Sequence, residues 1–347
     1  MLTLDGGDGG GQLIRWAVAL SAVTGTPIRM RNVRGARDTP GLRPQHVAAI
    51  GLLEEITDAR TEGVDRGSTE VLFEPKSVRG GEYAIDIGTA GSVSLVVDTV
   101  LPLGVTIPDR IAVDVSGGTD VKWAPPIDYT RHVKRPLLSR SGLELTLSVD
   151  RRGFYPAGGG QVHLNLDPSS LESIDRDRRG ALVEVSVYSV ASESLSDASV
   201  AERQADAARD AVSETVSVPV RSTVEYAETA SKGSSILIVT SFDRSVAGFS
   251  ALGEPGKPSE DVAADAVERT RDFLDTEAAV DAHMADQLLP FLAVAGGSFT
   301  CPDDTDHLRT AIDIVEAFGV DLKIEDEGDL VRIAVESPLS VEALKTD

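Results

Sequence analysis

The sequence has 347 residues, and 41% of them are hydrophobic and spread along the whole chain, which predicts a globular protein and excludes a disordered one. Cys301 is the single cysteine, so an internal disulfide and a CxxC metal or redox site are excluded. No apolar stretch approaches the roughly 20 residues of a membrane span, and the first residues do not resemble a secretory signal. We therefore expect a protein of the reducing cytoplasm.

The net charge is the unusual property of this sequence. Its 56 acidic and 33 basic residues give a formal net charge of −23, and only seven of the basic residues are Lys. An acidic, lysine-poor chain with regular hydrophobic patterning indicates a halophilic surface, on which concentrated salt screens the repulsion. The alternative is a protein that avoids nucleic acid, because nucleic-acid binders usually present a basic face. A nucleic-acid site in this chain must therefore be local.

The first 150 residues predict short strands and helices in a mixed order. A strand at Leu2–Leu4 is followed by a glycine-rich turn and by a helix whose apolar residues recur from Leu13 to Leu20. A second strand is predicted over 28–33 and a second helix over 46–57. Residues 68–150 predict alternating strands with Gly and Pro turns. This pattern is less regular than that of a doubly wound parallel sheet.

The second half of the chain predicts a small module between two parts of a larger one. Residues 171–180 are highly charged and are typical of a linker. Beyond them, strands are predicted over 181–190, 220–226 and 235–240, with a helix near 201–212. Two helices follow, one starting at Pro258 and one containing 283–287. The last unit is predicted as a strand over 298–301, a helix over 307–318, and strands over 320–325 and 330–336.

Two glycine-rich turns could bring backbone N–H groups close to an anion. Gly9, Gly10 and Gly11 precede the first helix, whose N-terminus carries partial positive charge. Gly158, Gly159 and Gly160 lie between Pro156 and a predicted strand. Neither turn matches a Walker loop or GxGxxG, so a tight structural connection is the alternative for both.

The loop before the second helix concentrates scarce basic residues. Arg34, Arg37 and Arg43 all precede His46 within thirteen residues. Guanidinium groups suit the planar recognition of phosphate. Ion pairs with nearby Asp residues are the alternative, and the sequence alone does not decide between the two.

His307 is the histidine whose position best suggests chemistry. It follows the turn 302–306 and begins a predicted helix. A helix N-terminus disfavours a protonated imidazole and leaves a neutral ring that can attack phosphorus or accept a proton. A structural role is the alternative. His163, within a predicted strand, and Cys301 are expected to be structural.

Several motifs together resemble those of the RNA 3′-terminal phosphate cyclase family, in the same order over nearly the whole chain. The most specific is Arg152-Gly-Phe-Tyr-Pro-Ala-Gly-Gly-Gly-Gln-Val162. The further matches are Asp5-Gly with Gly-Gly-Gly-Gln12-Leu-Ile-Arg15, the segment 34–46, Gly88-Thr-Ala-Gly-Ser92, Ser116-Gly-Gly-Thr-Asp120 with Ala124-Pro-Pro126, Ala285-Asp-Gln-Leu288, and His307-Leu-Arg-Thr310.

The resemblance implies an α+β fold. Its large domain would contain three repeated β/α units, each a four-stranded sheet plus two helices, with a smaller α/β domain inserted before the third unit. In this chain the large domain would cover 1–178 and 276–347, and the inserted domain 179–275.

The resemblance also implies an enzyme of the ligase class that transfers a nucleotide from ATP to an RNA with a 3′-terminal phosphate. His307 would attack the α-phosphorus of ATP and form histidine–AMP, releasing pyrophosphate. AMP would then pass to the RNA end, giving RNA(3′)pp(5′)A. The adjacent 2′-OH would displace AMP and leave a 2′,3′-cyclic phosphate, and because this step needs a 2′-OH, RNA is the natural substrate.

The other expected site residues follow from the same match. The terminal phosphate or the pyrophosphate would be held by Arg15, Arg34, Arg37, Gln45 and His46. The nucleotide would be bound by Pro125 as an apolar wall for adenine, by His283 in place of an aromatic ring, and by Asp286 and Gln287, which would also support metal binding.

Asp8 marks a departure from the family pattern. It stands where the family has Glu before its three glycines, and the motif here is slightly shorter. If Asp8 contacts the divalent ion, Mg²⁺ or Mn²⁺, the metal must lie closer to the backbone because Asp is one methylene shorter.

Two other functions are compatible with parts of this pattern. Cyclase-like ribosome-assembly or RNA-binding factors have the fold and the glycine-rich signature but lack the nucleophile, and the presence of His307 favours the enzyme. An enolpyruvyl transferase would share a similar repeat-built fold, an analogy at the level of fold alone.

Overall fold

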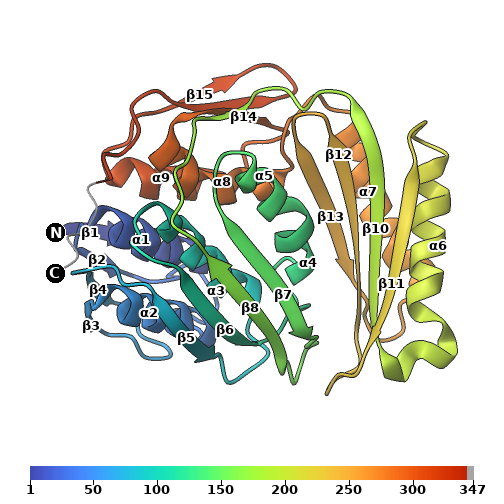
Figure 1. The fold of residues 1–347 in the computed structure, drawn as a ribbon, viewed down its shortest axis with the longest axis horizontal. Coiled ribbons are helices and arrows are strands. Elements are labelled where there is room, and N and C mark those ends of the chain that lie inside the picture. The colour runs from blue at the N-terminus through green and yellow to red at the C-terminus, as the bar shows by residue number, and fades with distance from the viewer. Residues whose placement is uncertain (342–347) are drawn as a thin grey trace.

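The structure is a computed structural model that describes residues 1–341, and within them it is a mixed α+β fold (Figure 1). The described strands form four sheets of four strands each. Three of these sheets surround a group of helices, and the fourth lies to one side with two helices of its own.

The first sheet has the strand order β1-β2-β4-β3. Its first two strands are parallel and its other pairs are antiparallel. Its elements are β1 (Leu2–Asp5), α1 (Gly11–Thr24), β2 (Ile28–Arg31), α2 (Pro44–Thr57), β3 (Arg60–Glu62) and β4 (Val71–Glu74).

The second and third sheets follow the same order and the same pattern of directions. The second is β5-β6-β8-β7, and the third is β9-β14-β16-β15. The second contains β5 (Gly81–Asp86), α3 (Val93–Val100), β6 (Ile111–Gly117), α4 (Ile127–Tyr129), α5 (Arg135–Ser139), β7 (Leu145–Arg151) and β8 (Gly160–Leu166). The third contains β9 (Ile174–Arg176), α8 (Ala282–Ala295), β14 (Gly297–Cys301), α9 (Asp306–Ala317), β15 (Leu322–Asp326) and β16 (Val331–Val335).

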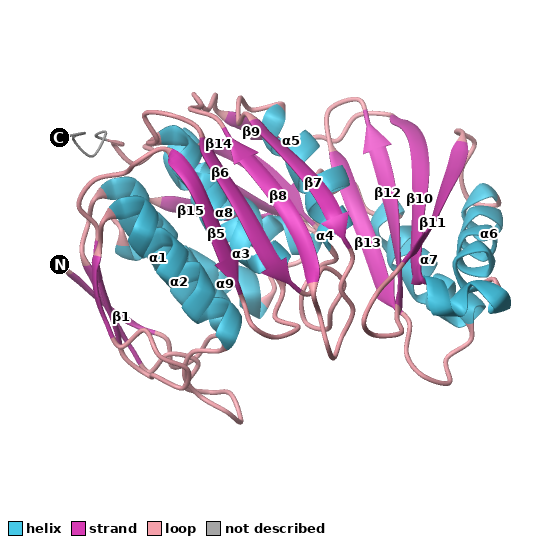
Figure 2. Ribbon diagram, turned by 60° about the horizontal axis from the view of Figure 1, so that its bottom comes forward, coloured by secondary structure: helices cyan, strands magenta, loops and turns pink. Residues whose placement is uncertain are grey.

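The fourth sheet is formed by the chain between β9 and α8. Its order is β11-β10-β12-β13, and it has a small core of its own in which α6 and α7 pack against the strands. Its elements are β10 (Leu182–Ser192), α6 (Val200–Ser213), β11 (Val220–Ala227), β12 (Ser234–Phe242), β13 (Val246–Leu252) and α7 (Ser259–Leu274). Figure 2 shows this sheet and its helices as a separate layer beside the other three sheets.

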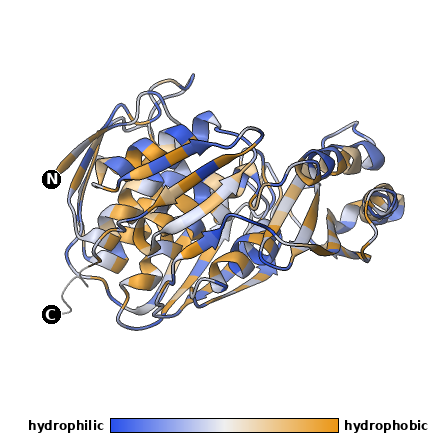
Figure 3. Ribbon diagram, turned by 90° about the horizontal axis from the view of Figure 1, so that it is seen from above, coloured by the Kyte–Doolittle hydropathy of each residue, from blue (hydrophilic) through white to orange (hydrophobic). Residues whose placement is uncertain are grey.

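Helix α1 lies at the centre of the larger region. Every residue from Leu13 to Val23 is buried, because the helix is apolar almost all round and contacts α2, α3, α8 and α9. Figure 3 shows hydrophobic residues gathered where helices and sheets pack and hydrophilic residues along the outer loops. The starts of these helices are therefore held in fixed positions relative to one another.

Three details of the predicted organisation were wrong. Residues 68–150 hold α3, α4 and α5 as well as strands, and α3 starts where the Ser92 hydroxyl accepts from Leu95 N–H. The predicted linker 171–180 contains β9, which pairs with β14. Strand β13 was not predicted. The last six residues of the predicted range 276–347 lie outside the described part of the chain.

No helix among residues 1–341 is both long enough and apolar enough to span a bilayer.

Candidate active site

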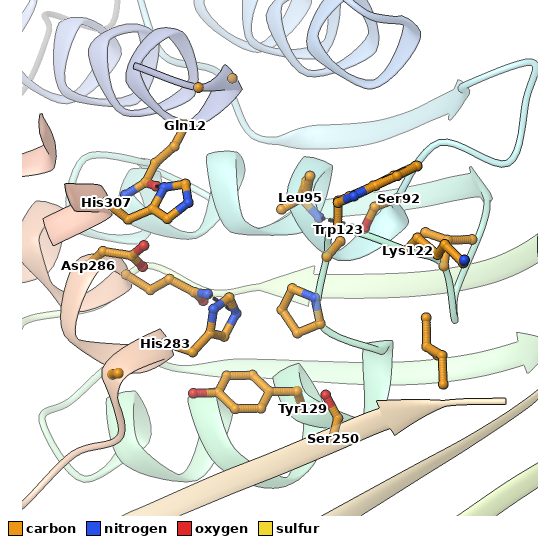
Figure 4. Close-up of a pocket in the computed structure, with 18 of the residues that line it drawn as sticks. Gln12, Ser92, Leu95, Lys122, Trp123, Tyr129, Ser250, His283, Asp286 and His307 are labelled. Carbon is orange, nitrogen blue, oxygen red and sulfur yellow. Dashed lines mark hydrogen bonds between the residues drawn. The ribbon is translucent and has the colours of Figure 1, made fainter. Parts of the chain in front are cut away.

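A cavity of about 2020 Å³ opens between the larger region and strand β13 of the fourth sheet. Five helices begin on its wall: Gly11 of α1, Pro44 of α2, the α3 cap Ser92, Ala282 of α8 and His307 in the first turn of α9 all line it. The positive ends of five helix dipoles therefore point toward one space, which favours an anion there. Figure 4 shows side chains from several of these elements turned into the cavity.

Most of the predicted site residues come together on this wall. The cavity is lined by Gly10, Gly11, Arg15, Arg34, Arg37, Gln45, His46, Pro125, His283, Asp286, Gln287 and His307. Five predicted residues are not part of the lining: Asp8, Gly9, Gly158, Gly159 and Gly160.

His307 is oriented by a residue of the central helix. Its Nδ1 lies 3.1 Å from Gln12 Oε1, and Figure 4 shows the two side chains meeting between α1 and α9. A carbonyl oxygen only accepts hydrogen bonds, so Nδ1 carries the proton and Nε2 keeps its lone pair. Loss of water around the ring and the charge of Arg37 lower the pKa of His307. The ring is thus neutral at pH 7 and suited to nucleophilic attack.

The N-terminus of α1 has no side-chain cap, and two cationic or donor groups lie against it. A Cβ at Gly11 would collide with the His46 ring, and one at Gly10 would lie 3.1 Å from the Arg37 guanidinium. His46 Nδ1 accepts from Arg43 N–H at 3.1 Å, so its proton is on Nε2, the nitrogen nearest Gly11. Burial and nearby Arg15 lower the pKa of His46 to about 3. Free N–H groups, a guanidinium and a neutral imidazole donor therefore surround one position.

The three arginines of the 34–43 loop have no carboxylate partner among the described residues. Arg34 donates to the backbone oxygens of Thr39 and Gly41, and Arg37 and Arg43 form no ion pair within residues 1–341. Burial and the charges of Arg43 and Arg37 lower the pKa of Arg34. The structure therefore favours anion binding over local ion pairing for this loop. We call Arg34, Arg37 and Arg43 the arginine clamp.

Helix α8 supplies the neighbouring part of the wall, beside α1 and α9. Its start is fixed by Asp281, which accepts from Met284 N–H, the Tyr129 hydroxyl and Gly248 N–H of β13. His283 bonds to Gln287, and Gln287 Oε1 and Asp286 Oδ1 are buried without a partner among the described residues. Burial raises the pKa of Asp286 to about 7, although Lys134 and Arg15 oppose this. Buried acceptors without partners on a cavity wall suit a ligand that brings N–H or O–H groups.

A buried ion pair lies behind this wall. Lys134 Nζ is 2.6 Å from Asp98 Oδ1, and both side chains are 2% exposed. Arg15, 6% exposed, donates to Leu95 O, and its Nε has no partner within residues 1–341. Desolvation lowers the pKa of Arg15 and of Lys134, while Asp98 opposes both shifts. Arg15 is thus held at the cavity with donor capacity left for a ligand.

The second glycine-rich turn packs behind the cavity wall. Gly158 and Gly159 have φ of 68° and 74°, which favours glycine. A Cβ at Gly158 would come within 2.8 Å of Ala90 Cα, so the turn packs closely on the segment 89–92 that lines the cavity. It supports the wall and does not face the cavity.

The described residues offer no preformed metal site. Within 1–341 no group of three or more His, Cys, Asp or Glu side chains is arranged to hold a metal ion. Asp8 is exposed and outside the lining. The role of Asp8 stays a prediction.

Several residues that line the cavity were not predicted as site residues from the sequence. Gln12 follows three glycines at a helix start, a position from which a side chain faces whatever the helix end binds. Arg43 was noted without a specific role. Trp123, and Tyr155 within the quoted signature, were given no role in the site, although both line the cavity.

A sequence model of the family described as RNA 3′-terminal phosphate cyclase matches residues 6–324. The chain belongs to this family. It is similar to the RNA 3′-terminal phosphate cyclase of Halobacterium salinarum, with 43% identity over 96% of this chain and 100% of the relative. The corresponding proteins of Pyrococcus furiosus and Archaeoglobus fulgidus are each 40% identical, over 92% and 96% of this chain and 93% and 100% of theirs.

A crystal structure of an enolpyruvyl transferase from Streptomyces tendae aligns with 98% of this chain and 49% of its own. The TM-score is 0.36 and the identity is 11%, so we draw no conclusion from this likeness.

Proposed function

We propose that this member of the cyclase family converts an RNA 3′-terminal phosphate to a 2′,3′-cyclic phosphate with ATP. The observation that carries the proposal is the pairing of His307 with Gln12 on a cavity wall that also holds the arginine clamp. A neutral, oriented imidazole next to unpaired guanidinium groups is suited to nucleotidyl transfer.

The first step would form histidine–AMP. His307 Nε2 attacks the α-phosphorus of ATP, a P–N bond forms, and the α–β P–O bond breaks to release pyrophosphate. The N–H groups at the start of α1, together with Arg37, would stabilise the charge that develops on the phosphoryl oxygens. Gln12 would stabilise the positive charge on the ring by accepting from Nδ1.

The second and third steps would take place in the same cavity. An oxygen of the RNA 3′-phosphate attacks the AMP phosphorus, the P–N bond breaks, and RNA(3′)pp(5′)A forms. The 2′-OH then attacks the phosphorus that is bound to the 3′ oxygen of the RNA. The P–O bond to AMP breaks, AMP leaves, and the hydroxyl proton passes to solvent. Arg15, the arginine clamp, Gln45 and His46 would hold the phosphate of the RNA end.

The nucleotide would bind toward α8. His283 offers a ring to adenine, Pro125 lines the cavity as an apolar surface, and Asp286 and Gln287 carry buried acceptors that are free for a ligand. Mg²⁺ or Mn²⁺ would arrive with the ATP phosphates and neutralise part of their charge. Asp8 does not line the cavity, so the residues that do line it would carry the transfer steps.

We also propose the finer organisation that the family resemblance implies. The shared strand order of the first three sheets supports three repeats of one β/α unit. The separate core of β10–β13 with α6 and α7 supports an inserted domain at 179–275 and a large domain at 1–178 and 276–347. The acidic, lysine-poor composition supports a halophilic cytoplasmic protein.

Incubation with ATP labelled at the α-phosphate tests the function. In KCl-rich buffer with Mg²⁺ or Mn²⁺, the native protein should acquire a label that is lost in acid and stable in alkali, as a phosphoramidate is. His307→Ala should not be labelled, and Thr229→Ala, in the fourth sheet's β11–β12 loop, serves as the control. A folded native protein without label would contradict the proposal and favour a non-catalytic RNA-binding relative.

A further inference from the structure

The exposed aromatic side chains of this chain are concentrated on one cavity. Among residues 1–341 the large hydrophobic side chains with high exposure are Met1, Trp123, Tyr155, Val183, Val224 and Ile324. Of these, only Trp123 and Tyr155 are aromatic, and both line the candidate active site. Trp123 is 93% exposed and Tyr155 is 61% exposed. Only 4% of the residues are aromatic, and a solvent-exposed indole at a cavity indicates a surface that binds a partner.

The loop that carries Trp123 is anchored on both sides. Thr119 N–H donates to Gly153 O at 2.9 Å, and Ile127 N–H donates to Thr119 O at 2.8 Å. The Ser94 hydroxyl donates to Pro125 O at 2.9 Å. Lys122 pairs with Glu254 beyond β13 at 2.7 Å. The base of the loop is therefore fixed while the indole at its tip touches water.

The backbone of Trp123 is strained. Its φ is 64°, in the left-handed region that bulky residues avoid. Strain of this kind persists where the surrounding structure imposes it, and it is concentrated at binding sites. The contacts that impose it here are those that fix the loop, since the indole itself is not packed against the protein.

We propose that Trp123 is a stacking platform for a base of the RNA strand that adjoins the 3′-terminal phosphate, with Tyr155 as a second ring. This inference rests on the proposed function, because it takes the RNA end to be held at the arginine clamp. Proteins that bind single-stranded RNA combine phosphate contacts with aromatic rings on which bases stack. The clamp and the two rings provide both elements on one cavity.

The adenine of ATP is the competing partner for the indole. Figure 4 shows His283 and Asp286 beside His307, whereas Trp123 and Lys122 lie across the cavity from it. Of the nucleotide contacts proposed above, His283, Asp286 and Gln287 belong to α8, and Pro125 lies in the loop that carries Trp123. The indole itself is 93% exposed, which favours a polynucleotide that enters from solvent over an adenine enclosed beside α8.

Intrinsic fluorescence provides a direct test, because the chain has two Trp residues and the other, Trp16, is 1% exposed. A 3′-phosphorylated single-stranded oligoribonucleotide should quench the emission of the full-length protein in KCl-rich buffer. Trp123→Phe should remove this response and leave the emission of Trp16. An abasic nucleotide at the stacked position should remove the quenching, and abasic nucleotides elsewhere should not.

Affinity and labelling separate this inference from the proposed function. Trp123→Gly should weaken binding of the oligonucleotide about 5- to 150-fold, the range for losing one stacked base, and Trp123→Phe should restore most of it. Labelling from ATP alone should be unchanged in both variants. The melting temperature of Trp123→Gly should not fall, since glycine relieves the positive φ.

Trp16 also lines the cavity, so the response of Trp123 is the part that Trp123→Phe removes. Three results would overturn the inference: quenching by ATP without RNA that is lost in Trp123→Phe, unchanged RNA affinity in Trp123→Gly, or a lower melting temperature in that variant, which would indicate a packing role. The absence of label on the native protein would contradict the proposed function alone, since the fluorescence response to RNA does not require adenylylation.

Discussion

Arginine serves two opposite purposes in two regions of this molecule. Arg152, at the start of the glycine-rich signature, is 3% exposed and lies 2.8 Å from both Asp128 and Glu225 and 3.6 Å from Asp120. Glu225 belongs to β11, and Asp120 also accepts from Ser235 of β12. Burial disfavours the charge of Arg152, but Asp120, Glu225 and Asp128 together raise its pKa. Arg152 therefore joins the second sheet's loop to the fourth sheet.

The arginine clamp differs because its charges are left without carboxylates. Arg37 and Arg43 line an open cavity and form no ion pair within residues 1–341. A guanidinium that is paired with buried carboxylates cannot be removed without leaving them uncompensated, and an unpaired one is available to a ligand. Partner groups, and not the net charge of −23, therefore decide whether a basic residue of this protein can bind an anion.

Arg152→Met should produce the largest loss of stability. It leaves Asp120 buried without its counter-charge and removes one of the two guanidinium partners of Asp128, the other being Arg131. Removal of one partner of a buried ion pair costs about 3–5 kcal/mol. Denaturant unfolding in KCl-rich buffer measures the effect. A loss of unfolding free energy below about 1 kcal/mol would show that the junction contributes little, and it would contradict the contrast between Arg152 and the arginine clamp.

Arg37→Gln should slow AMP transfer and leave stability nearly unchanged, in contrast to Arg152→Met. Loss of one donor to developing negative charge costs about 10²- to 10³-fold in rate, while the free energy of unfolding should change by less than about 0.5 kcal/mol. Single-turnover labelling and AMP transfer to a 3′-phosphorylated RNA, alongside denaturant unfolding, separate the two. Large destabilisation with normal transfer would assign Arg37 to the structural group.

Asp286→Asn tests the role of partner groups on a buried acidic residue. The folded-state pKa of Asp286 is raised from 3.8 to about 7, so its contribution to stability is fully present below pH 3.8 and is lost as pH rises through about 7. Asn does not ionise, so the variant should be more stable above pH 7, by about 1–3 kcal/mol for a poorly satisfied buried group. Denaturant unfolding of both proteins across this pH range tests the prediction. A difference in unfolding free energy that does not change with pH would contradict it.

Arg110→Gln should have the smallest effect. Arg110 pairs with Asp167 at 2.7 Å, but its side chain is 62% exposed and it lies outside the cavity lining. Exposed ion pairs contribute about 0–1 kcal/mol. A change beyond that range, measured by the same denaturant unfolding, would show that pairing alone, without burial, is enough to stabilise this protein.

The sequence predicted the parts whose signals are local. The helix from Leu13 to Leu20 has regular apolar spacing, and its position was confirmed. His307 was identified from its place at a helix start, and the structure does place it in the first turn of α9. Motifs far apart in sequence were expected to share a site, and the cavity lining brings most of them together.

The elements that were missed depend on contacts that the local sequence does not encode. Strand β9 has three residues in a charged segment, and its pairing partner β14 lies more than 120 positions away. Helix α3 is rich in Val, which favours strands, and its position depends on packing against α2 and on the Ser92 cap. The conformation of the loop that carries Trp123 depends on hydrogen bonds to residues of other elements.

The five helix starts around the cavity have a consequence for recognition in concentrated salt. Conventional basic RNA-binding faces act through counterion release, and their affinity falls steeply as salt rises. At 1 M salt the screening length is about 3 Å, so only groups in direct contact with an anion still attract it. Peptide N–H groups at helix ends act at that range and add nothing to the net charge. If the cavity binds a phosphate terminus, the helix starts would therefore add to the arginine clamp an attraction that acts in direct contact and does not depend on the net charge of the protein.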